Sequence, residues 1–451
     1  MDDYVLAFVM AGGRGSRLKI LTKHRTKPAV SILGQYRIFD FVGTNIANSD
    51  IPAAIIAAQF KPRSLRNHIR NGDVWGFDGI DQKIEVTQPR EEDGKIIEFK
   101  GTADSVRKSM RQINSHNPRI VLILGGDHVY AMSYDDTIRQ HKRNNADATI
   151  MACAITEKKV SDFGLMKVDE TGKILDFVEK PTDPDVIERF RMSDRIKNSL
   201  GIDEDYEFLA SMGNYVFFRD RLEKFLDYDG TDFGNDIIPK IKKEGGDLYA
   251  YPFNGYWRDV GKVGDYFDCN MDFVLRNRPI NLVKHRIRTR MRALPAPRIE
   301  IGAKVESSIL SDGSHIFTGS KLKNCILGYQ TMINENVEMK DCILLGADRN
   351  QYYKNQLREY NTTFIDSNTS LERVIFDKNV KIGSNVQISP KFGSPKERER
   401  RFREIGLKPY KESNGKIEGD FFIDEERNIL VLGKRVRDKK EDLTIPDGFQ
   451  G

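Results

Sequence analysis

The sequence predicts an α/β chain in which a doubly wound, mostly parallel, Rossmann-like domain is followed by a parallel β-helix. The first observation is a series of short apolar runs that alternate with amphipathic stretches from Val5 to about Leu275. The second is a set of apolar residues that recur every 17 positions after residue 299. Alternating strands and helices are typical of a parallel sheet covered on both faces. Short repeats with single β-branched positions are typical of a solenoid.

Composition narrows the class of protein. The chain has 451 residues, of which 39% are hydrophobic and 31% charged, so it can build two or three soluble domains. No apolar run approaches the roughly 18–20 residues that cross a bilayer, and the run at Val5 begins too early for a signal peptide to precede it. The four cysteines show no C-x-x-C spacing, which favours free thiols in the cytoplasm. A net charge of +5 suits anionic small molecules and indicates neither nucleic acid nor a membrane as a partner.

Short apolar runs mark the predicted strands of the first domain, residues 1–275. Each run is flanked by glycine or polar residues and is apolar on both faces, as a strand between two helical layers should be. The runs are Val5–Met10, Ala53–Ala58, Ile120–Leu124, Ala148–Ile155 and Tyr215–Phe218. Helices are expected between them at Ser105–Ser115 and Tyr134–Asn144. Ligands of such sheets bind beyond the carboxyl ends of the strands.

A repeat defines the second domain, which follows a basic, proline-marked linker over 276–298. The tripeptides Ser308–Leu310, Cys325–Leu327 and Cys342–Leu344 recur with a spacing of 17 residues. The same spacing relates Val305, Leu322 and Met339, and also Ile316 and Ile333. A fourth copy, with Leu371 and Val374–Phe376, comes 32 residues after the third, which places a 15-residue insertion at 348–362. The spacing predicts a parallel β-helix over 299–390 with three hexapeptides per coil. An antiparallel meander with fortuitous spacing is the alternative.

A charged segment, 391–451, is expected to complete the β-helix domain. Its run Lys396–Arg403 is typical of a solvated helix face, and Asn428–Leu432 is a further apolar segment.

The first candidate site follows the first predicted strand. Gly12, Gly13 and Gly15 stand where glycines let backbone N–H groups approach a phosphate. The spacing is neither that of a P-loop nor that of a dinucleotide fingerprint, so a purely structural turn is an equal alternative. Arg17 and Lys27 supply cations that can neutralise a triphosphate, and they favour the phosphate site.

These residues and eight further motifs, in order over the first 275 residues, resemble the bacterial glucose-1-phosphate adenylyltransferases, or ADP-glucose pyrophosphorylases. The motifs are Tyr36–Phe41, Gly101–Val106, Gly125–Tyr130, Phe163-Gly164, Val178–Pro181, Ser211–Tyr215, Asp232–Asp236 and Tyr256–Gly261. The resemblance implies that ATP and α-D-glucose 1-phosphate form ADP-glucose and pyrophosphate, for glycogen- or starch-type glucan synthesis. It also implies a left-handed β-helix, a Mg²⁺ cofactor, allosteric control and a homotetramer.

Two aspartates are the candidate metal ligands. Asp127 follows the predicted strand Ile120–Leu124 through two glycines, so its carboxylate is expected at the ligand edge of the sheet. Asp259 lies in a second polar cluster, and two carboxylates with substrate phosphates can hold one Mg²⁺. Either residue alone would equally well cap a loop. The resemblance assigns both to the metal, and Asp127 also to the catalytic group.

The resemblance places the sugar phosphate on a second group of residues. Glu179 is expected to accept hydrogen bonds from the sugar hydroxyls, and Lys180 to contact the phosphate; taken alone, they would be an exposed charge pair before a turn. Gly164 and Ser211 are placed in the same pocket. Phe99 stands where many bacterial members have tyrosine, which removes one possible hydroxyl contact.

The nucleotide is assigned to the glycine-rich run and to four more residues. Gly101 and Thr102 resemble the segment that lies along the base and ribose. Gln59 and Gln88 are candidates for reading adenine, because an amide can both donate and accept. Ordinary surface glutamines are the equal alternative.

The expected mechanism is an in-line attack of the sugar phosphate oxygen on the α-phosphorus of ATP. The attacking phosphate is already ionised, so catalysis should be mainly alignment and charge stabilisation by Arg17, Lys27 and the metal. The alternatives are UDP-, dTDP- or GDP-sugar synthesis and a catalytically silent regulatory subunit. An acyltransferase on the β-helix, where His315 is the histidine among the repeats, is a third.

By resemblance, His24, Arg25 and Arg37 form an effector site for an anion. Enterobacterial members are activated by fructose 1,6-bisphosphate through a lysine at the position of His24, and their AMP site has a histidine at the position of Ser31. A histidine with an unperturbed pKa of about 6.5 is mostly neutral at pH 7.5. The sequence therefore predicts weak activation that grows as the pH falls towards 6 and His24 gains a proton.

Overall fold

The computed structural model describes residues 4–79, 82–89, 91–92, 95–275, 279–347, 363–434 and 443–451. Contacts within the chain divide it into two compact units. Unit 1 consists of Met1–Gly13, Phe41–Pro62 and Arg66–Trp257, and unit 2 of Arg14–Asp40, Arg63–Leu65 and Arg258–Gly451. The short segment 14–40 thus groups with the C-terminal half of the chain, although the sequence places it inside the first domain.

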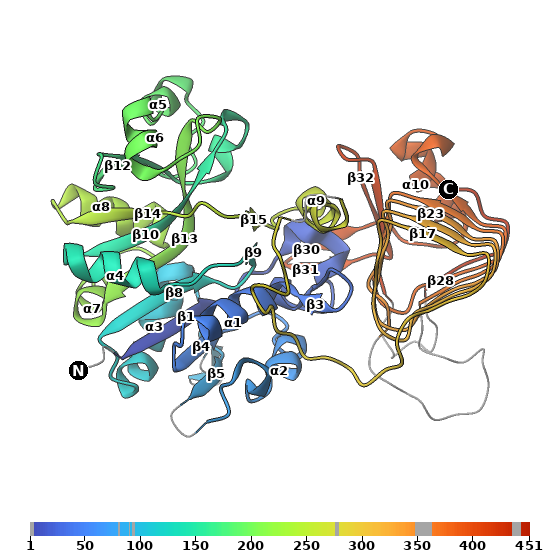
Figure 1. Ribbon diagram of the computed structural model, residues 1–451, viewed down its shortest axis with the longest axis horizontal. Coiled ribbons are helices and arrows are strands. Elements are labelled where there is room, and N and C mark those ends of the chain that lie inside the picture. The colour runs from blue at the N-terminus through green and yellow to red at the C-terminus, as the bar shows by residue number, and fades with distance from the viewer. Residues whose placement is uncertain are drawn as a thin grey trace. The chain divides into compact units, whose positions relative to one another are not determined.

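Unit 1 is built on a mixed sheet (Figure 1). Its strands along the main path are β12 (Ile174–Val178), β11 (Leu165–Val168), β13 (Phe208–Phe218), β8 (Ile120–Gly125), β1 (Val5–Met10), β4 (Ala53–Ala57) and β5 (Lys83–Thr87). Two further strands, β10 (Ala148–Ile155) and β14 (Leu248–Pro252), join it through β13. β8, β1, β4 and β5 are parallel, whereas β13 runs antiparallel to β8, β10 and β11. The predicted strand Tyr215–Phe218 is therefore real but belongs to a longer, antiparallel strand.

Helices cover both faces of this sheet, as the doubly wound prediction requires. They include α3 (Thr102–Ser115), α4 (Asp135–Asn144), α7 (Arg219–Leu226) and α8 (Ile238–Lys243). On one face, residues of α3, α7 and α8 form a single apolar cluster with alternate residues of the strands, such as Ile150 of β10. On the other face, His141 of α4 hydrogen-bonds Thr149, the strand neighbour of Ile150 (Nδ1–Oγ1 2.9 Å).

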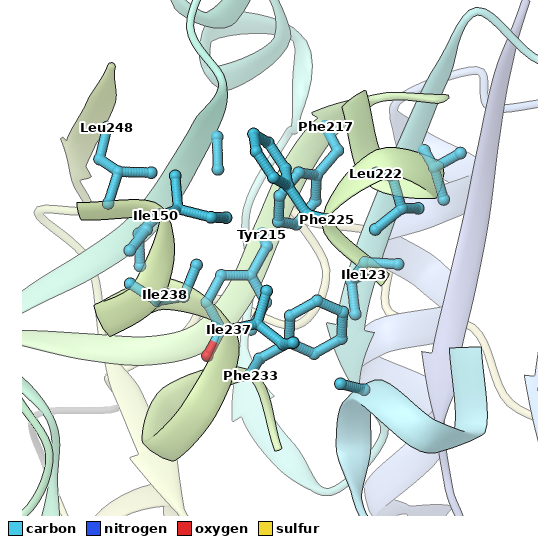
Figure 2. Packing of buried hydrophobic residues seen from close by; sticks show 14 of the residues in the cluster. Ile123, Ile150, Tyr215, Phe217, Leu222, Phe225, Phe233, Ile237, Ile238 and Leu248 are labelled. Atoms are coloured by element: carbon cyan, nitrogen blue, oxygen red, sulfur yellow. The ribbon is translucent and has the colours of Figure 1, made fainter. Parts of the chain in front are cut away.

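Figure 2 shows the centre of the first cluster, where aromatic residues of β13 meet those of the turn before α8. The rings of Tyr215 and Phe233 lie 5.1 Å apart, and those of Phe217 and Phe233 lie 5.9 Å apart. Residues such as Phe217 and Phe233 are almost wholly removed from water. This core fixes β13 and the segment 231–237, which both contribute to the site described below.

Unit 2 contains a parallel β-helix of three sheets (Figure 1). The first sheet is β16 (Arg298–Ile299), β19 (His315–Ile316), β22 (Thr331–Ile333), β25 (Thr363–Ile365), β28 (Lys381–Ile382) and β34 (Thr444–Ile445). The second is β17 (Lys304–Glu306), β20 (Lys321–Lys323), β23 (Glu338–Lys340), β26 (Ser370–Glu372) and β29 (Gln387–Ile388). The third is β18 (Ile309–Leu310), β21 (Ile326–Leu327), β24 (Ile343–Leu344), β27 (Val374–Phe376), β33 (Ile429–Leu432) and β32 (Phe421–Asp424).

The 17-residue repeat corresponds to one coil. Val305 pairs with Leu322, Leu322 with Met339, and Met339 with Leu371 in parallel register. The fourth copy therefore stacks directly on the third across the 32-residue step, which excludes the meander. The insertion at 348–362 lies outside the described residues. Stacked apolar residues, including Leu322 and Met339, form the core of the coil.

The charged C-terminal segment also contributes to unit 2. β33 pairs with β27 and β34 with β28, both in parallel. The run Lys396–Arg403 lies in helix α10 (Pro395–Glu404), where Ser394 and Glu397 form a capping box. The prediction of a wholly solvated helix face needs one correction, because Arg398 and Phe402 on this helix are buried.

The remaining elements are short or connect the two units. The helices are α1 (Ile38–Asn48), α2 (Arg63–Ile69), α5 (Pro184–Glu188), α6 (Asp194–Leu200) and α9 (Val263–Val274). The short helical turns are η1 (Ser16–Thr22), η2 (Lys27–Ala29), η3 (Asp73–Trp75), η4 (Glu157–Asp162), η5 (Phe233–Ile237) and η6 (Pro390–Phe392). The short strands are β2 (Ser31–Ile32), β3 (Tyr36–Arg37), β6 (Glu91–Glu92), β7 (Lys95–Ile96), β9 (His128–Tyr130), β15 (Trp257–Asp259), β30 (Lys411–Ser413) and β31 (Lys416–Glu418).

Two global features bear on the composition argument. The four cysteines, all within the described ranges, are buried and form no disulfide. Within the residues that the structure describes, no helix combines the length and apolar character needed to cross a membrane.

Candidate active site

The predicted nucleotide residues of unit 1 lie along the carboxyl edge of the parallel strands. Met10 at the end of β1 is in register with Ala57 of β4, and Ala57 with Thr87 of β5. The residues just beyond these strand ends are therefore neighbours along one edge of the sheet. They include three of the predicted nucleotide residues, Gly12, Gln59 and Gln88.

Gly12, Gln59 and Phe99 meet at this edge. The Oε1 atom of Gln59 accepts a hydrogen bond from the backbone N–H of Phe99 at 2.7 Å, which fixes the direction of the amide. A Cβ on Gly12 would lie 3.6 Å from Cβ of Gln59 and 3.8 Å from Cδ2 of Phe99. Gly13 is more open, since a Cβ there would meet no atom within 4 Å. Phe99 thus lies beside predicted nucleotide residues, and its role in the sugar group stays a prediction.

Asp127 stands at the same edge, in the turn after β8. The last residue of β8, Gly125, is in register with Met10, and the N–H of Gly126 donates to the carbonyl of Met10 at 3.0 Å. A Cβ on Gly126 would lie 3.0 Å from Cγ1 of Val9, so a glycine lets the turn run close to β1. The side chain of Asp127 is 34% exposed, and its Oδ1 lies 3.6 Å from Nε2 of His128. The carboxylate therefore lies at the strand ends and is partly exposed, and its role as a metal ligand stays a prediction.

An aromatic contact links the Asp127 turn to the predicted sugar group. The ring of His128 lies edge-on to Trp257 with centroids 5.3 Å apart, and Trp257 lies 5.1 Å from the ring of Phe163. Phe163 precedes Gly164 in the sequence. The side chain of Trp257 was not among the predicted site residues.

The predicted sugar residues come together around Glu179. A Cβ on Gly164 would lie 2.5 Å from Oε2 of Glu179, and a Cβ on Gly234 would lie 2.7 Å from the same oxygen. The backbone N–H of Ser211 donates to the carbonyl of Gly164 at 2.8 Å, which joins this pocket to β13. Burial raises the pKa of Glu179, and the adjacent Lys180, whose Nζ is 3.4 Å from Oε1 of Glu179, opposes that shift. Only glycines at 164 and 234 leave space for this carboxylate.

The hydroxyl of Thr102 connects the start of α3 to this pocket. It donates to Oδ2 of Asp232 at 2.9 Å and accepts from the backbone N–H of Phe233 at 2.9 Å. At Gly101 a Cβ would meet the carbonyl carbon of Thr231 at 2.8 Å, so the two segments are in close contact. Thr102 thereby holds the turn that carries Gly234 against Glu179. This contact gives Thr102 a structural task beside its predicted role along the base and ribose.

Two further residues, Tyr215 and Asp232, interact electrostatically with Glu179 and were not among the predicted site residues. Burial raises the pKa of Tyr215, and the carboxylates of Glu179 and Asp232 add to that shift. Both residues belong to motifs of the family resemblance. These motifs were recognised, but no local pattern distinguished Tyr215 and Asp232 from the other residues in them.

In unit 2, three predicted catalytic and metal residues converge. Nζ of Lys27 lies 2.9 Å from Oδ1 of Asp259, and the Lys27 side chain is 7% exposed. A Cβ on Gly261 would lie 3.4 Å from Oδ2 of Asp259 and 3.8 Å from Nη2 of Arg17, so both side chains border this glycine. Gly15, which has a φ of 64°, lies against Lys27, since a Cβ there would be 3.0 Å from Cβ of Lys27. The arrangement places Lys27 against the Asp259 carboxylate and Arg17 beside the neighbouring Gly261.

The predicted effector residues also lie in unit 2. Nη1 of Arg25 donates to Oδ1 of Asp377 at 2.8 Å, and both side chains are almost fully buried. The backbone N–H of Arg37 donates to Oδ2 of Asp40 at 2.8 Å, and its guanidinium donates to the carbonyl of Ala29. The positive charge of Arg25 is therefore balanced inside the chain. An effector role for Arg25 and Arg37 stays a prediction.

His24 differs from its expected behaviour. Its Nε2 lies 3.2 Å from the backbone oxygen of Lys434. Burial lowers its pKa to about 4; the carboxylate of Asp377 opposes this shift, and the nearby Lys434, Lys23 and Arg25 add to it. The prediction that His24 gains a proton as the pH falls towards 6 is thus wrong for the folded chain.

The donor atoms available for a metal are carboxylate oxygens. Among the described residues, no three histidine, cysteine, aspartate or glutamate side chains form a metal cluster. Mg²⁺ commonly takes one or two protein carboxylates and completes its shell with water and substrate phosphates. The exposed carboxylate of Asp127 and that of Asp259, 25% exposed, have the chemistry this ion needs.

Comparison with known proteins agrees with these observations. Residues 6–275 match the nucleotidyl transferase family, and residues 292–404 match the left-handed parallel β-helix domain of the GLGC type. The chain is 34% identical to the glucose-1-phosphate adenylyltransferase of Acetivibrio thermocellus over 456 aligned positions, which cover 99% of this chain and 91% of that protein. The predicted fold class, including a left-handed β-helix, is therefore confirmed. The chain belongs to the glucose-1-phosphate adenylyltransferase family of nucleotidyl transferases.

Proposed function

We propose that this chain forms ADP-glucose and pyrophosphate from ATP and α-D-glucose 1-phosphate. The contact of Lys27 with Asp259, with Arg17 beside the neighbouring Gly261, carries the proposal, because it gathers the charges that a triphosphate and its metal require. The glycine-walled pocket of Glu179, with Lys180 beside it, adds a carboxylate for sugar hydroxyls and a cation for a phosphate. The product would supply glycogen- or starch-type glucan synthesis.

The chain's own groups bind and orient the two substrates in this reaction. Lys180, 57% exposed, holds the phosphate of the sugar, whose oxygen attacks the α-phosphorus while pyrophosphate leaves in line. Arg17 and Lys27 offset the charge that builds on the α-phosphoryl group and on the leaving pyrophosphate. A dianionic sugar phosphate needs no general base, so positioning and charge stabilisation supply most of the rate enhancement.

We also propose Mg²⁺ as the cofactor, with Asp127 and Asp259 as its protein ligands. When bound, the ion would neutralise phosphate charge and help to align the substrates. Asp259 accepts a hydrogen bond from Lys27 at 2.9 Å, so this lysine is held next to the proposed metal ligand. The pair can orient Lys27 towards the same phosphates.

A panel assay separates this function from its alternatives. Pyrophosphate release is measured with ATP, UTP, dTTP and GTP, each combined with glucose 1-phosphate and with mannose 1-phosphate. The proposal expects kcat/KM for ATP with glucose 1-phosphate to exceed every other pair by at least about tenfold. A preference for another base or sugar identifies a different sugar nucleotidyltransferase. A folded protein that is inactive with every pair when assayed alone, but is part of an active enzyme when a partner subunit is added, supports the regulatory-subunit alternative.

We further propose a homotetramer in the cytoplasm. β16, β17 and β18 stand at the ends of their sheets, so the first coil of the β-helix has an open edge. Ile299 and Ile301 at this coil are 49% and 94% exposed, which favours a protein partner there. Light scattering that gave a stable 51.7 kDa monomer at micromolar concentration would refute the tetramer.

The absence of disulfides among the four cysteines supports a reducing compartment.

A further inference from the structure

A small β-hairpin in unit 2 lies against the segment that carries the glycine-rich loop. β30 and β31 pair antiparallel around Asn414 and Gly415, both with positive φ, which is the sequence and geometry of a tight hairpin turn. β31 and the following β32 both lie alongside η1, the helical turn Ser16–Thr22. In Figure 1 the labels β30 and β31 stand beside the blue N-terminal ribbon.

The tip of this hairpin contacts Arg14. The guanidinium of Arg14 lies so close to Gly415 that a Cβ there would be 3.0 Å from Cζ of Arg14 and nearer still to Nη1. Arg14 stands between Gly13 and Gly15, inside the predicted phosphate-binding loop. A glycine at the hairpin tip is therefore what allows the two segments to meet.

The base of the hairpin holds Lys19. Nζ of Lys19 lies 4.8 Å from the ring centroid of Tyr410 and 5.5 Å from that of Phe422, and the two rings are edge-on at 5.7 Å. Lys19 has a φ of 55° and a ψ of −125°, a sparsely populated backbone conformation inside η1. Such a conformation persists when surrounding contacts impose it. Lys23 adds a hydrogen bond from Nζ to the carbonyl of Gly419.

The loop contains three glycines, at positions 12, 13 and 15. Glycines at 12, 13 and 15 have more conformational freedom to lose on ordering than other residues. The carbonyl of Gly15 accepts hydrogen bonds from the backbone N–H of Leu18 at 3.0 Å and from the Thr22 hydroxyl at 2.9 Å. Contacts from the hairpin therefore restrict Arg14 and Lys19 on either side of Arg17. A binding loop that is already ordered loses less entropy when its ligand arrives.

We propose that the hairpin β30–β31 positions the nucleotide-binding segment Arg14–Thr22 and so strengthens ATP binding. Tyr410, Phe422 and Gly415 are then positioning residues, which act through Lys19 and Arg14 without touching the substrate. This inference rests on the proposed function, because ATP is the ligand that the segment would hold. It assigns the C-terminal hairpin a selective effect on the nucleotide and none on the sugar phosphate.

The test uses initial-rate kinetics and ATP-binding calorimetry on four point variants of the full chain. Tyr410→Leu and Lys19→Met each remove one partner of the cation–aromatic contact. They should raise the KM and Kd for ATP about three- to tenfold, with the KM for glucose 1-phosphate and the melting temperature unchanged. Tyr410→Phe keeps the ring and should stay within about twofold of wild type. Lys416→Gln, on the same hairpin but 78% exposed, is the matched control.

A deletion of residues 411–418 removes both strands of the hairpin and its tip but keeps Tyr410 and Phe422, which contact Lys19. The break can be closed, because a Cβ on Gly419 would lie 2.8 Å from Cα of Tyr410. This variant loses the contact to Arg14 and should also show a raised KM for ATP alone. It tests the tip separately from Lys19.

The outcomes decide the proposal in either direction. An unchanged or lowered KM for ATP in both Tyr410→Leu and the deletion overturns it, as does an equal rise in both KM values with a lower melting temperature. If wild type makes no ADP-glucose, the proposed function fails, and the calorimetric Kd for ATP then decides the hairpin's role. A wild-type protein that does not bind ATP at all overturns both.

Discussion

Replacement of Gly164 by alanine tests the sugar pocket directly. The new methyl carbon would lie 2.5 Å from Oε2 of Glu179 and 2.7 Å from Cζ of Phe177. A carbon and an oxygen in favourable contact stay about 3.3 Å apart, so the carboxylate must retreat by about 0.8 Å from its position. Because Oε2 is the end of a flexible side chain, the chain can fold with the carboxylate displaced.

The expected result is a selective loss of sugar phosphate use. A displacement of about 1 Å in a positioning group can cost about 10²-fold in rate. We therefore expect kcat/KM for glucose 1-phosphate to fall about 100-fold, with the KM for ATP within about twofold of wild type. The assay follows pyrophosphate release with glucose 1-phosphate varied at saturating ATP.

The matched control is Gly79→Ala. At Gly79 the nearest atoms to an added Cβ belong to the side chain of Gln82, an exposed residue, with Oε1 at 2.9 Å. This variant should keep both kinetic constants. An unchanged kcat/KM for glucose 1-phosphate in folded Gly164→Ala protein would show that Glu179 does not contact the sugar.

Further predictions concern the proposed metal ligand, the sugar phosphate, a buried ion pair and His24. Asp127→Asn should keep the fold and lower kcat by about 10²–10³; near-normal turnover at saturating Mg²⁺ would remove Asp127 from the mechanism. Lys180→Gln should mainly raise the KM for glucose 1-phosphate. A change confined to the KM for ATP would show that this lysine contacts the nucleotide instead. Asp377→Asn should lower the free energy of unfolding by about 3–5 kcal/mol, because it leaves the charge of Arg25 buried; a denaturant titration with less than about 1 kcal/mol of change contradicts this. Fructose 1,6-bisphosphate should activate weakly at both pH 7.5 and pH 6, since His24 stays neutral above about pH 4, and activation that grows towards pH 6 contradicts the assignment. The unfolded chain protonates this histidine near pH 6.5, so its contribution to stability is lost as the pH falls from 6.5 towards 4, and His24→Gln should flatten that part of the unfolding profile.

Local patterns predicted the elements well because each depends on nearby residues. The strand Val5–Met10 has the predicted bounds, since a buried parallel strand needs a continuous apolar run. The register of the coil repeat could be predicted from the sequence because Val305, Leu322 and Met339 must stack to form one core. The antiparallel direction of β13 could not be predicted, because an apolar run does not indicate which way the strand runs in the sheet.

The site was harder to predict because its contacts join distant parts of the chain. Lys27 and Asp259 are separated by 232 positions, and the sequence gives no measure of the 2.9 Å between them. The lowered pKa of His24 depends on burial and on Lys434, which a local pattern cannot show. The two glycines that flank Glu179 come from motifs 70 residues apart, although each motif by itself was recognised.

The division of the chain into two units has a consequence for folding during synthesis. Residues 14–40 form their compact unit with residues beyond 258, so most of their partners are made long after them. Asp377, the partner of Arg25, lies 352 positions later, and a ribosome adding about 5–20 residues per second needs about 20–70 s to reach it. During that interval a segment with a glycine-rich loop and several cations lacks most of its native partners. A chaperone or nascent-chain partner that covers residues 14–40 would therefore act on this protein before its C-terminal half exists.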